Sequence, residues 1–417
     1  MEKLFIKGKK KISGSISISG SKNATLPILA ASLLANNIKL TNVPFVKDIS
    51  TMLELLRFIG TTVKIMRDKK SIELKNNKNI KTLAPYNLVK TMRAGVLVLG
   101  PLLTKYKKAK VSLPGGCAIG TRPVDLHLFA LKKLGAKIKI KDGYIIAEAM
   151  KGLKGTKIKF PSISVGATEN ALLAAYGAEG KTILMNCAIE PEIMDLISFL
   201  RKLGCKIKTS GRKITFISKL LTKNKISHQI IFDRIEAGTY LVAGALIGKK
   251  IKINKIKPKI LKCEIDILKR MGVVLLKDKK SISILKSKNL KKINISTKPF
   301  PGLPTDLQAQ LMVLMTQANG QSSIKENIFE NRFMHVPELK RMGAKIEVKD
   351  KIAYIDGPTK LTGAEVMATD LRASVSLVLA GLIADNRTIV NRIYHLDRGY
   401  EYLDSKLKNC KAEIKRI

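Results

Sequence analysis

A loop at residues 114–127 holds the residues best suited to chemistry. It reads PGGCAIGTRPVDLH and places one thiol, Cys117, among three glycines and two prolines. Glycine lets a backbone approach a ligand closely, and proline keeps the segment out of regular structure. Such a loop offers no packing face, and the nearby charge of Arg122 favours a thiolate. We therefore expect Cys117 to be a functional thiol.

The net charge of the chain is the second feature. Lys and Arg number 77 against 32 Asp and Glu, which gives +45. Such an excess ordinarily indicates a nucleic acid or an anionic membrane as partner. Here the Lys residues are scattered as KK and KxK pairs, as in 137–141 and 249–259, and the chain has no Trp. Basic runs interleaved with stacking aromatics are therefore missing, and we expect no nucleic-acid partner.

Arg is scarce in this chain, where Lys supplies most of the positive charge. An Arg is therefore expected where a planar, bidentate donor is needed. Five of them lie in or beside small-residue or turn-rich motifs and are candidate anion ligands: Arg93, Arg122, Arg332, Arg372 and Arg398.

Cysteine usage and hydropathy bound the class of protein. The five Cys are widely spaced and form no CxxC pair, which argues against a disulfide framework and a zinc site. The first residues lack the apolar core of a signal peptide, and no apolar run is long enough to span a membrane. No glycine-rich loop of the GxxxxGK type occurs. We expect a cytoplasmic protein that needs no metal, no cofactor and no membrane.

An internal repeat sets the architecture. A helix that ends in glycine and leads into a strand recurs about every 70 residues. The strand alternates apolar residues with Lys, so one face is buried. In a degenerate sixth copy, Asn409 is expected to take the left-handed position of the glycine. The glycines are Gly60, Gly135, Gly204, Gly272 and Gly343.

Each repeat also contains a helix that is apolar on nearly every side, and such a helix must be buried. The repeats therefore predict an α/β protein of two similar domains with helices inside and sheets outside. We expect an N-terminal catalytic domain at 22–229 that carries the Cys loop, a second domain of the same fold at 1–21 plus 230–417, and an active site in the cleft between them. The buried helices begin near Asn23, Arg93, Gly166, Asp233, Asp306 and Asp370.

Polar residues of the buried helices gather in their first turns. Helix N-termini carry unpaired N–H groups and a positive dipole, so six converging N-termini would bind phosphates and carboxylates. Capping alone explains Asp233 and Asp370. A cation such as Lys22 or Arg93 opposes the dipole unless an anion lies between. The polar residues are Lys22, Asn23, Arg93, Thr168, Glu169, Asp233, Glu236, Asp306, Asp370 and Arg372.

Seven segments make the sequence recognisable. The chain resembles the UDP-N-acetylglucosamine enolpyruvyl transferase family (1-carboxyvinyltransferases) of the EPSP synthase-like superfamily, along its whole length and in order. This resemblance implies two inside-out α/β barrel domains, each of three βαβαββ-type units. The sister family, EPSP synthase, shares that fold but is not expected to carry the Cys loop. The segments are SGSKNATLPILAASLLA (19–35), PGGCAIGTRPVDLHL (114–128), SVGATENALLAA (164–175), DRIEAGTY (233–240), GLPTDLQAQ (302–310), IFENRFMHVPEL (328–339) and HLDRGYE (395–401).

The resemblance implies a reaction. The enolpyruvyl group of phosphoenolpyruvate passes to the 3′-hydroxyl of UDP-N-acetylglucosamine by addition and elimination, with release of phosphate, as the first committed step of peptidoglycan synthesis. Asp306 is our choice for the base that takes the hydroxyl proton. The family assigns protonation of the phosphoenolpyruvate methylene, and alkylation by fosfomycin, to Cys117. Lys22 and Arg398 complete the expected catalytic group as cations that offset charge in the intermediate.

The resemblance also implies the two substrate sites. Ser162 stands where many family members carry Lys. We therefore do not expect the contact that this Lys would make with the diphosphate. The expected phosphoenolpyruvate ligands are Lys22, Asn23, Arg122, Arg332, Arg372 and Arg398. The expected UDP-sugar ligands are Asn23, Arg93, Arg122, Pro123, Val124, Asp125, Leu126, Ser162, Ile163, Ser164, Val165, Asp306 and Ile328.

Two other functions stay open on the sequence alone. One is 3-phosphoshikimate 1-carboxyvinyltransferase activity, and the other is non-catalytic polyanion binding, which only the net charge supports. We infer no obligate protein partner. Among the remaining polar residues, His127 and His395 are expected to make structural hydrogen bonds, and Asp397 is expected to position its neighbour Arg398.

Overall fold

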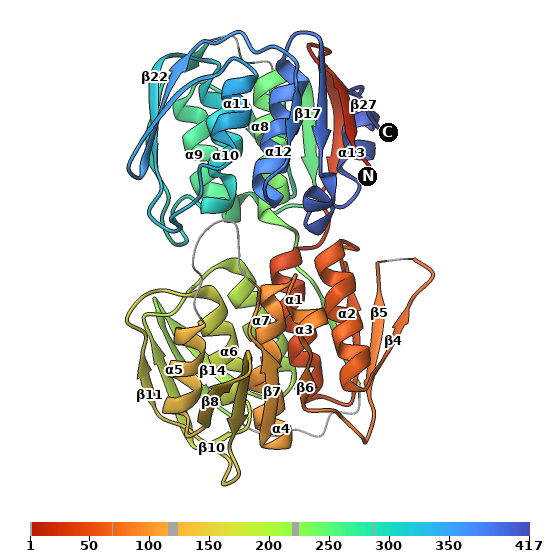
Figure 1. Cartoon of the computed structure of the whole chain (residues 1–417), viewed down its shortest axis with the longest axis vertical. Coiled ribbons are helices and arrows are strands. Elements are labelled where there is room, and N and C mark those ends of the chain that lie inside the picture. The colour runs from red at the N-terminus through yellow and green to blue at the C-terminus, as the bar shows by residue number, and fades with distance from the viewer. Residues whose placement is uncertain (1, 69, 116–123, 219–224, 286, 288) are drawn as a thin grey trace. The chain divides into compact units, whose positions relative to one another are not determined.

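The computed structural model describes residues 2–68, 70–115, 124–218, 225–285, 287 and 289–417 (Figure 1). Contacts divide the chain into two compact units. Of the described residues, unit 1 contains those within 2–19 and 232–417, and unit 2 those within 20–115 and 124–231. Each unit has an apolar core of its own. The expected assignment of catalysis to these parts of the chain stays a prediction.

Six sheets in the described residues share one pattern of pairing. A first strand runs parallel to a second, the second is antiparallel to a third, and the third is antiparallel to a fourth. In unit 2 they are β16 (Ile226–Gln229)–β3 (Asn37–Thr41)–β5 (Ile72–Asn76)–β4 (Thr61–Ile65), β6 (Leu83–Ala84)–β7 (Lys108–Ser112)–β9 (Tyr144–Glu148)–β8 (Lys137–Lys141) and β11 (Lys157–Lys159)–β13 (Lys181–Met185)–β15 (Lys213–Ile217)–β14 (Lys206–Ser210). A parallel pair, β10 (Leu153–Lys154) and β12 (Ala178–Glu179), lies outside these sheets.

Unit 1 repeats this pairing. Its sheets are β2 (Ile12–Ser17)–β17 (Gly248–Asn254)–β19 (Ser281–Leu285)–β18 (Leu275–Lys277), β20 (Leu290–Lys291)–β22 (Ala318–Lys325)–β24 (Ile352–Gly357)–β23 (Lys345–Lys349) with β21 (Asn294–Ser296) also on β22, and β25 (Glu365–Met367)–β26 (Arg387–Asn391)–β1 (Leu4–Lys7)–β27 (Glu413–Arg416). The shared pattern confirms the six repeats predicted from the sequence.

Three central helices contact one another in each unit and are buried on nearly every side. An all-apolar helix surface has no face that water could cover, which accounts for this position. Two of the expected helices begin differently, because a 3-10 turn precedes the α-helix near Arg93 and near Asp306. The central helices are α1 (Lys22–Ala31), η2 (Arg93–Val98) with α4 (Leu99–Tyr106), and α6 (Val165–Ala175) in unit 2, and α8 (Arg234–Ile247), η4 (Thr305–Leu307) with α10 (Gln308–Met315), and α12 (Leu371–Ile383) in unit 1.

The amphipathic helices end as predicted, with one correction. Gly60 and Gly343, like the other repeat glycines, have positive φ angles, which suit a left-handed helix end. In the sixth copy that residue is Lys411, with φ 71°, because the last helix runs through Asn409 itself. The prediction for Asn409 was therefore wrong by two positions. The helices are α2 (Lys47–Ile59), α5 (Asp125–Lys133), α7 (Pro191–Lys202), α9 (Lys262–Arg270), α11 (Val336–Arg341) and α13 (Leu403–Asn409).

Both units complete a sheet with a strand that is distant in the sequence. Strand β1 lies between β26 and β27, so the N-terminal segment completes the last sheet of unit 1. Strand β2 pairs with β17, although the whole of unit 2 separates them in the sequence. In unit 2, β16 pairs with β3 in the same way. None of the helices in the described ranges is both long and apolar enough to cross a membrane.

The crossing of α4 and α6 generates a prediction about packing. A Cβ on Gly100 would lie 2.7 Å from Asn170 Oδ1 and 2.8 Å from its carbonyl oxygen, whereas a Cβ on Gly244 in α8 meets only Ile284 side-chain atoms, at 3.2 Å. We expect Gly100→Ala to lower the free energy of unfolding by about 1–3 kcal/mol. Gly244→Ala should be near neutral, because helix propensity returns up to about 1 kcal/mol. Thermal denaturation of both variants tests this, and equal melting temperatures would contradict it.

Candidate functional site

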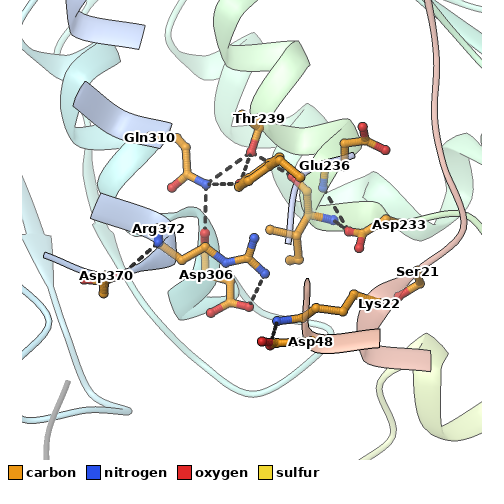
Figure 2. A network of polar contacts seen from close by, with 12 residues as sticks. Ser21, Lys22, Asp48, Asp233, Glu236, Thr239, Asp306, Gln310, Asp370 and Arg372 are labelled. Atoms are coloured by element: carbon orange, nitrogen blue, oxygen red, sulfur yellow. Dashed lines mark hydrogen bonds and ion pairs between the residues drawn. The ribbon is translucent and has the colours of Figure 1, made fainter. Parts of the chain in front are cut away.

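Lys22 is the first residue of α1 and carries its own counter-charge. Its Nζ lies 3.1 Å from Asp48 Oδ2, and the two side chains are only 11% and 8% exposed (Figure 2). Asp48 belongs to the first turn of α2, and Ser21 caps α1 by accepting a hydrogen bond from the Ala24 N–H. The sequence required an anion to explain a cation at this helix N-terminus. The structure supplies the Asp48 carboxylate.

In unit 1, Asp306 joins two guanidinium groups. Arg332 Nη2 donates to Asp306 Oδ1 at 2.7 Å, and Arg372 Nη2 donates to Oδ2 at 2.8 Å. The Arg side chains are 4% and 6% exposed, whereas Asp306 is 27% exposed. Such charge-assisted hydrogen bonds are stronger than neutral ones. Three of the predicted ligands are thereby brought together.

The first turn of α12 fixes Arg372. Asp370 caps this helix, because its side chain accepts from the backbone N–H groups of Arg372 and Ala373 at 2.7 and 3.1 Å. The guanidinium lies over the Tyr400 ring, 5.5 Å from its centroid. Burial alone would lower the pKa of Arg372, but the charge of Asp306 raises it above the usual value. Arg372 therefore stays charged in a buried position.

A buried polar network adjoins this ion pair through Gln310, which contacts the backbone of Asp306 (Figure 2). Gln310 Nε2 donates to the Asp306 carbonyl at 2.9 Å and contacts Thr239 Oγ1 and the Tyr400 hydroxyl at 3.2 Å each. Thr239 and Tyr400 are themselves 2.9 Å apart. Burial raises the pKa of Tyr400, while the nearby Arg372 opposes that shift. The network links α8, α10 and the segment after η5 (Ile393–Arg398).

Glu326 organises the loop that carries Ile328. This buried carboxylate accepts from the hydroxyl groups of Thr297 and Thr305 at 2.8 and 2.9 Å, and from the Ile328 N–H at 2.8 Å. Thr305 precedes Asp306 in η4. One carboxylate thus connects two predicted ligands of the sugar nucleotide, Asp306 and Ile328.

The N-terminus of α6 in unit 2 is also organised by side chains. Ser164 caps the helix by accepting from the Ala167 N–H at 3.3 Å. Asn170 contacts His127 Nδ1 at 3.2 Å, which fits the expected structural role of His127. A Cβ on Gly166 would lie 2.9 Å from the His127 ring, so the ring needs a glycine there. Burial, followed by the charges of Glu192 and Glu190, raises the pKa of Glu169.

Several predicted ligands lie at the start of elements. Asp125 begins α5 and is exposed, with Val124 buried before it and Leu126 half-buried after it. Ser162 and Ile163 lead into α6, whose first residue, Val165, is exposed. The remaining ones are Asn23, the second residue of α1, Arg93, the first of η2, and Arg398, the last of η5. Cys117, Arg122 and Pro123 lie outside the described residues.

Asp397 requires a correction. The sequence suggested that it positions Arg398, but its carboxylate pairs with Arg416 of β27 through both Oδ atoms. Neighbours on a 3-10 turn point in different directions, so adjacency in the sequence gave the wrong partner.

Sequence reasoning also missed four polar partners: Asp48, Thr239, Gln310 and Tyr400. Thr239 and Gln310 are polar residues inside otherwise apolar helices, and that contrast could have identified them. In the part of the chain that the structure describes, no cluster of three or more His, Cys, Asp and Glu side chains could hold a metal ion.

Comparison with known proteins assigns the chain to a family. The EPSP synthase family, described as 3-phosphoshikimate 1-carboxyvinyltransferase, matches residues 6–407. Proteins named UDP-N-acetylglucosamine 1-carboxyvinyltransferase from Pelagibacter ubique and Rickettsia akari are 58% and 51% identical to the chain, over 100% of each sequence. The chain therefore belongs to the EPSP synthase family and, within it, to the UDP-N-acetylglucosamine 1-carboxyvinyltransferases.

Solved structures agree with the fold. The enolpyruvyl transferase NikO from Streptomyces tendae has a TM-score of 0.90 to the chain, with 24% identity over 100% of this chain and 98% of that one. EPSP synthase from Acinetobacter baumannii has a TM-score of 0.78, with 19% identity over 100% of both chains. At identities below 25%, the structural similarity is evidence for the fold alone. It confirms the predicted fold class.

Near the start of α8, Glu236 generates a prediction about pH. This buried carboxylate accepts from the Ser19 N–H at 2.8 Å and pairs with Lys406. Burial raises the pKa of Glu236 from 4.5 to about 7, although Lys406 opposes the shift. The unfolded chain therefore releases this proton at lower pH than the folded chain does. As a result, stability falls as the pH rises from about 4.5 to about 7.

We expect Glu236→Gln to remove this loss. The melting temperature of the variant, relative to that of the wild type, should rise across the same pH window and then level off. Glu347→Gln, at a carboxylate that is 63% exposed, is the control. A difference that stays constant with pH would contradict the shift.

Proposed function

We propose that the chain transfers the enolpyruvyl group of phosphoenolpyruvate to the 3′-hydroxyl of UDP-N-acetylglucosamine and releases phosphate. The observation that carries this proposal is the full-length identity of 58% and 51% to enzymes named for that acceptor and that group. The product of this reaction enters peptidoglycan synthesis. The free cysteines of the described residues fit a reducing, cytoplasmic location.

The reaction needs a base, an acid and cations. Asp306 takes the proton of the sugar hydroxyl, because it is the carboxylate of the cluster that remains partly exposed. Cys117 protonates the methylene carbon of phosphoenolpyruvate, a role assigned from the sequence motif. Lys22 and Arg398 stabilise the charge that develops on the intermediate.

The paired arginines suit the anionic groups of phosphoenolpyruvate. Arg332 and Arg372 are planar donors already turned toward a carboxylate, Asp306. When the substrate anion takes a share of these donors, their hold on Asp306 weakens, and a carboxylate oxygen can accept the hydroxyl proton. Lys22, Asn23, Arg122 and Arg398 complete the proposed phosphoenolpyruvate ligands.

The sugar nucleotide binds at element starts. The capped N-terminus of α6, with Ser164 and Val165, offers backbone N–H groups to its diphosphate. The further proposed ligands are Asn23, Arg93, Arg122, Pro123, Val124, Asp125, Leu126, Ser162, Ile163, Asp306 and Ile328.

A second acceptor is favoured by one observation. The family description names 3-phosphoshikimate 1-carboxyvinyltransferase, so shikimate 3-phosphate is the competing acceptor. We expect phosphate release from phosphoenolpyruvate to be at least about 100-fold faster with UDP-N-acetylglucosamine, because a site built for one acceptor leaves polar groups unpaired with the other. A coupled phosphate assay with each acceptor tests this. Faster turnover with shikimate 3-phosphate would reverse the assignment.

The role of Asp306 leads to a second prediction. Asp306→Asn keeps the shape of the side chain but removes the base, so kcat should fall by about 10²- to 10⁴-fold. Asp356→Asn, at an exposed carboxylate of β24, is the matched control. Steady-state kinetics at saturating phosphoenolpyruvate give the comparison. A kcat within twofold of the control would exclude Asp306 as the base.

A further inference from the structure

We propose that Tyr400, Gln310 and Thr239 are positioning residues that hold Arg372 and Asp306 in their working geometry. None of the three is a predicted ligand, and all are buried. The inference rests on the proposed function of Asp306 and Arg372, and it adds three side chains that act through them.

The directions of the hydrogen bonds follow from counting protons. The Thr239 hydroxyl donates its one proton to the Ile235 carbonyl, at 2.9 Å. Toward Tyr400 it can therefore only accept, and the Tyr400 O–H donates to it, at 2.9 Å. The Tyr400 oxygen is then left as an acceptor for the Gln310 amide nitrogen, at 3.2 Å, and the Arg372 guanidinium lies over the ring that this hydroxyl anchors, 5.5 Å from its centroid. One directed chain thus runs from Tyr400 through Thr239 to a carbonyl of α8, and it holds the ring against which Arg372 packs.

Gln310 connects this chain to the base. A carbonyl cannot donate, so the contact with the Asp306 carbonyl, at 2.9 Å, requires the amide nitrogen of Gln310 on that side. The same nitrogen contacts Tyr400 and Thr239. Gln310 therefore ties the backbone of the base to the residue that seats its arginine partner.

The cost of this arrangement indicates a functional reason. Gln310 is fully buried in a helix that is otherwise largely apolar, and its Oε1 has no hydrogen-bond partner among the described residues. A Met of similar length would fill the same space without burying an unsatisfied oxygen. Packing alone would therefore favour an apolar side chain at this position. The amide is explained by its contacts with Asp306 and Tyr400.

The test is Tyr400→Phe, which removes only the hydroxyl. We expect kcat to fall about 10- to 100-fold through misplacement of Arg372 and Asp306, with the KM for UDP-N-acetylglucosamine little changed. The acid limb of the pH profile of kcat/KM should move to higher pH, since Asp306 is then held less firmly by a cation. Gln310→Met and Thr239→Val should act in the same direction, whereas Thr239→Ser keeps the hydroxyl and should retain activity.

Tyr240→Phe is the matched control. Tyr240 is equally buried in α8, and its hydroxyl has no hydrogen-bond partner in the described part of the chain. We expect its kcat and pH profile to equal those of the wild type. If Tyr400→Phe matches Tyr240→Phe in both readouts, or if the two lose activity only in proportion to melting temperature, the positioning role is wrong.

A separate measurement keeps this test independent of the acceptor. Calorimetric titration with phosphoenolpyruvate alone measures its affinity, to which Arg372 contributes as a proposed ligand, without turnover. The Tyr400→Phe variant should bind phosphoenolpyruvate several-fold more weakly than the Tyr240→Phe variant does. A wild type that turns over only shikimate 3-phosphate would refute the proposed acceptor, and the variants are then compared with that acceptor. Equal affinity for phosphoenolpyruvate in both Phe variants would overturn the positioning role itself.

Discussion

Three buried cations, Lys22, Arg332 and Arg372, are each paired with a carboxylate of their own unit. Removing a charge from water costs several kcal/mol unless a counter-charge replaces the lost hydration. Asp306 supplies that charge to Arg332 and Arg372, and Asp48 supplies it to Lys22. The cations can therefore oppose the helix dipoles and stay in place without a ligand. A substrate anion then meets donors that are already desolvated and aligned, which is the condition for strong electrostatic stabilisation.

The fold could be read from the sequence because its determinants are local and repeated. The apolar helices recur in all six units and the glycines that follow the amphipathic helices recur in five, so an error at one position did not change the predicted architecture. The exceptions are instructive. Lys411, rather than Asn409, takes the left-handed position, two residues after the last helical residue, which is also where Gly135, Gly204, Gly272 and Gly343 lie in their repeats. The 3-10 turns that begin at Arg93 and near Asp306 depend on tertiary packing, and no local sequence pattern predicts them.

The candidate site could be predicted only in part. Residue type identified the scarce arginines and Asp306, and the structure brings three of these side chains into contact. The partners could not be found in this way, because a hydrogen bond between distant segments leaves no spacing in the sequence. Asp48 looks like an ordinary acid in a first helical turn, and Tyr400 like a core aromatic. Asp397 shows the converse, since its neighbour in sequence is not its partner in space.

The interleaving of the two units in the sequence bears on how the chain acquires its structure during synthesis. Every strand assigned to unit 2 has been made once Gln229 has been added, so this unit can fold while the ribosome is still translating the rest. Strand β1 has the opposite fate, because its neighbours β26 and β27 are made only after the whole of unit 2 and most of unit 1. Strand β1 therefore keeps unpaired edges while the residues between it and β26 are translated. The Lys residues around it, at positions 3, 7, 9, 10 and 11, would discourage premature pairing with other chains during that interval.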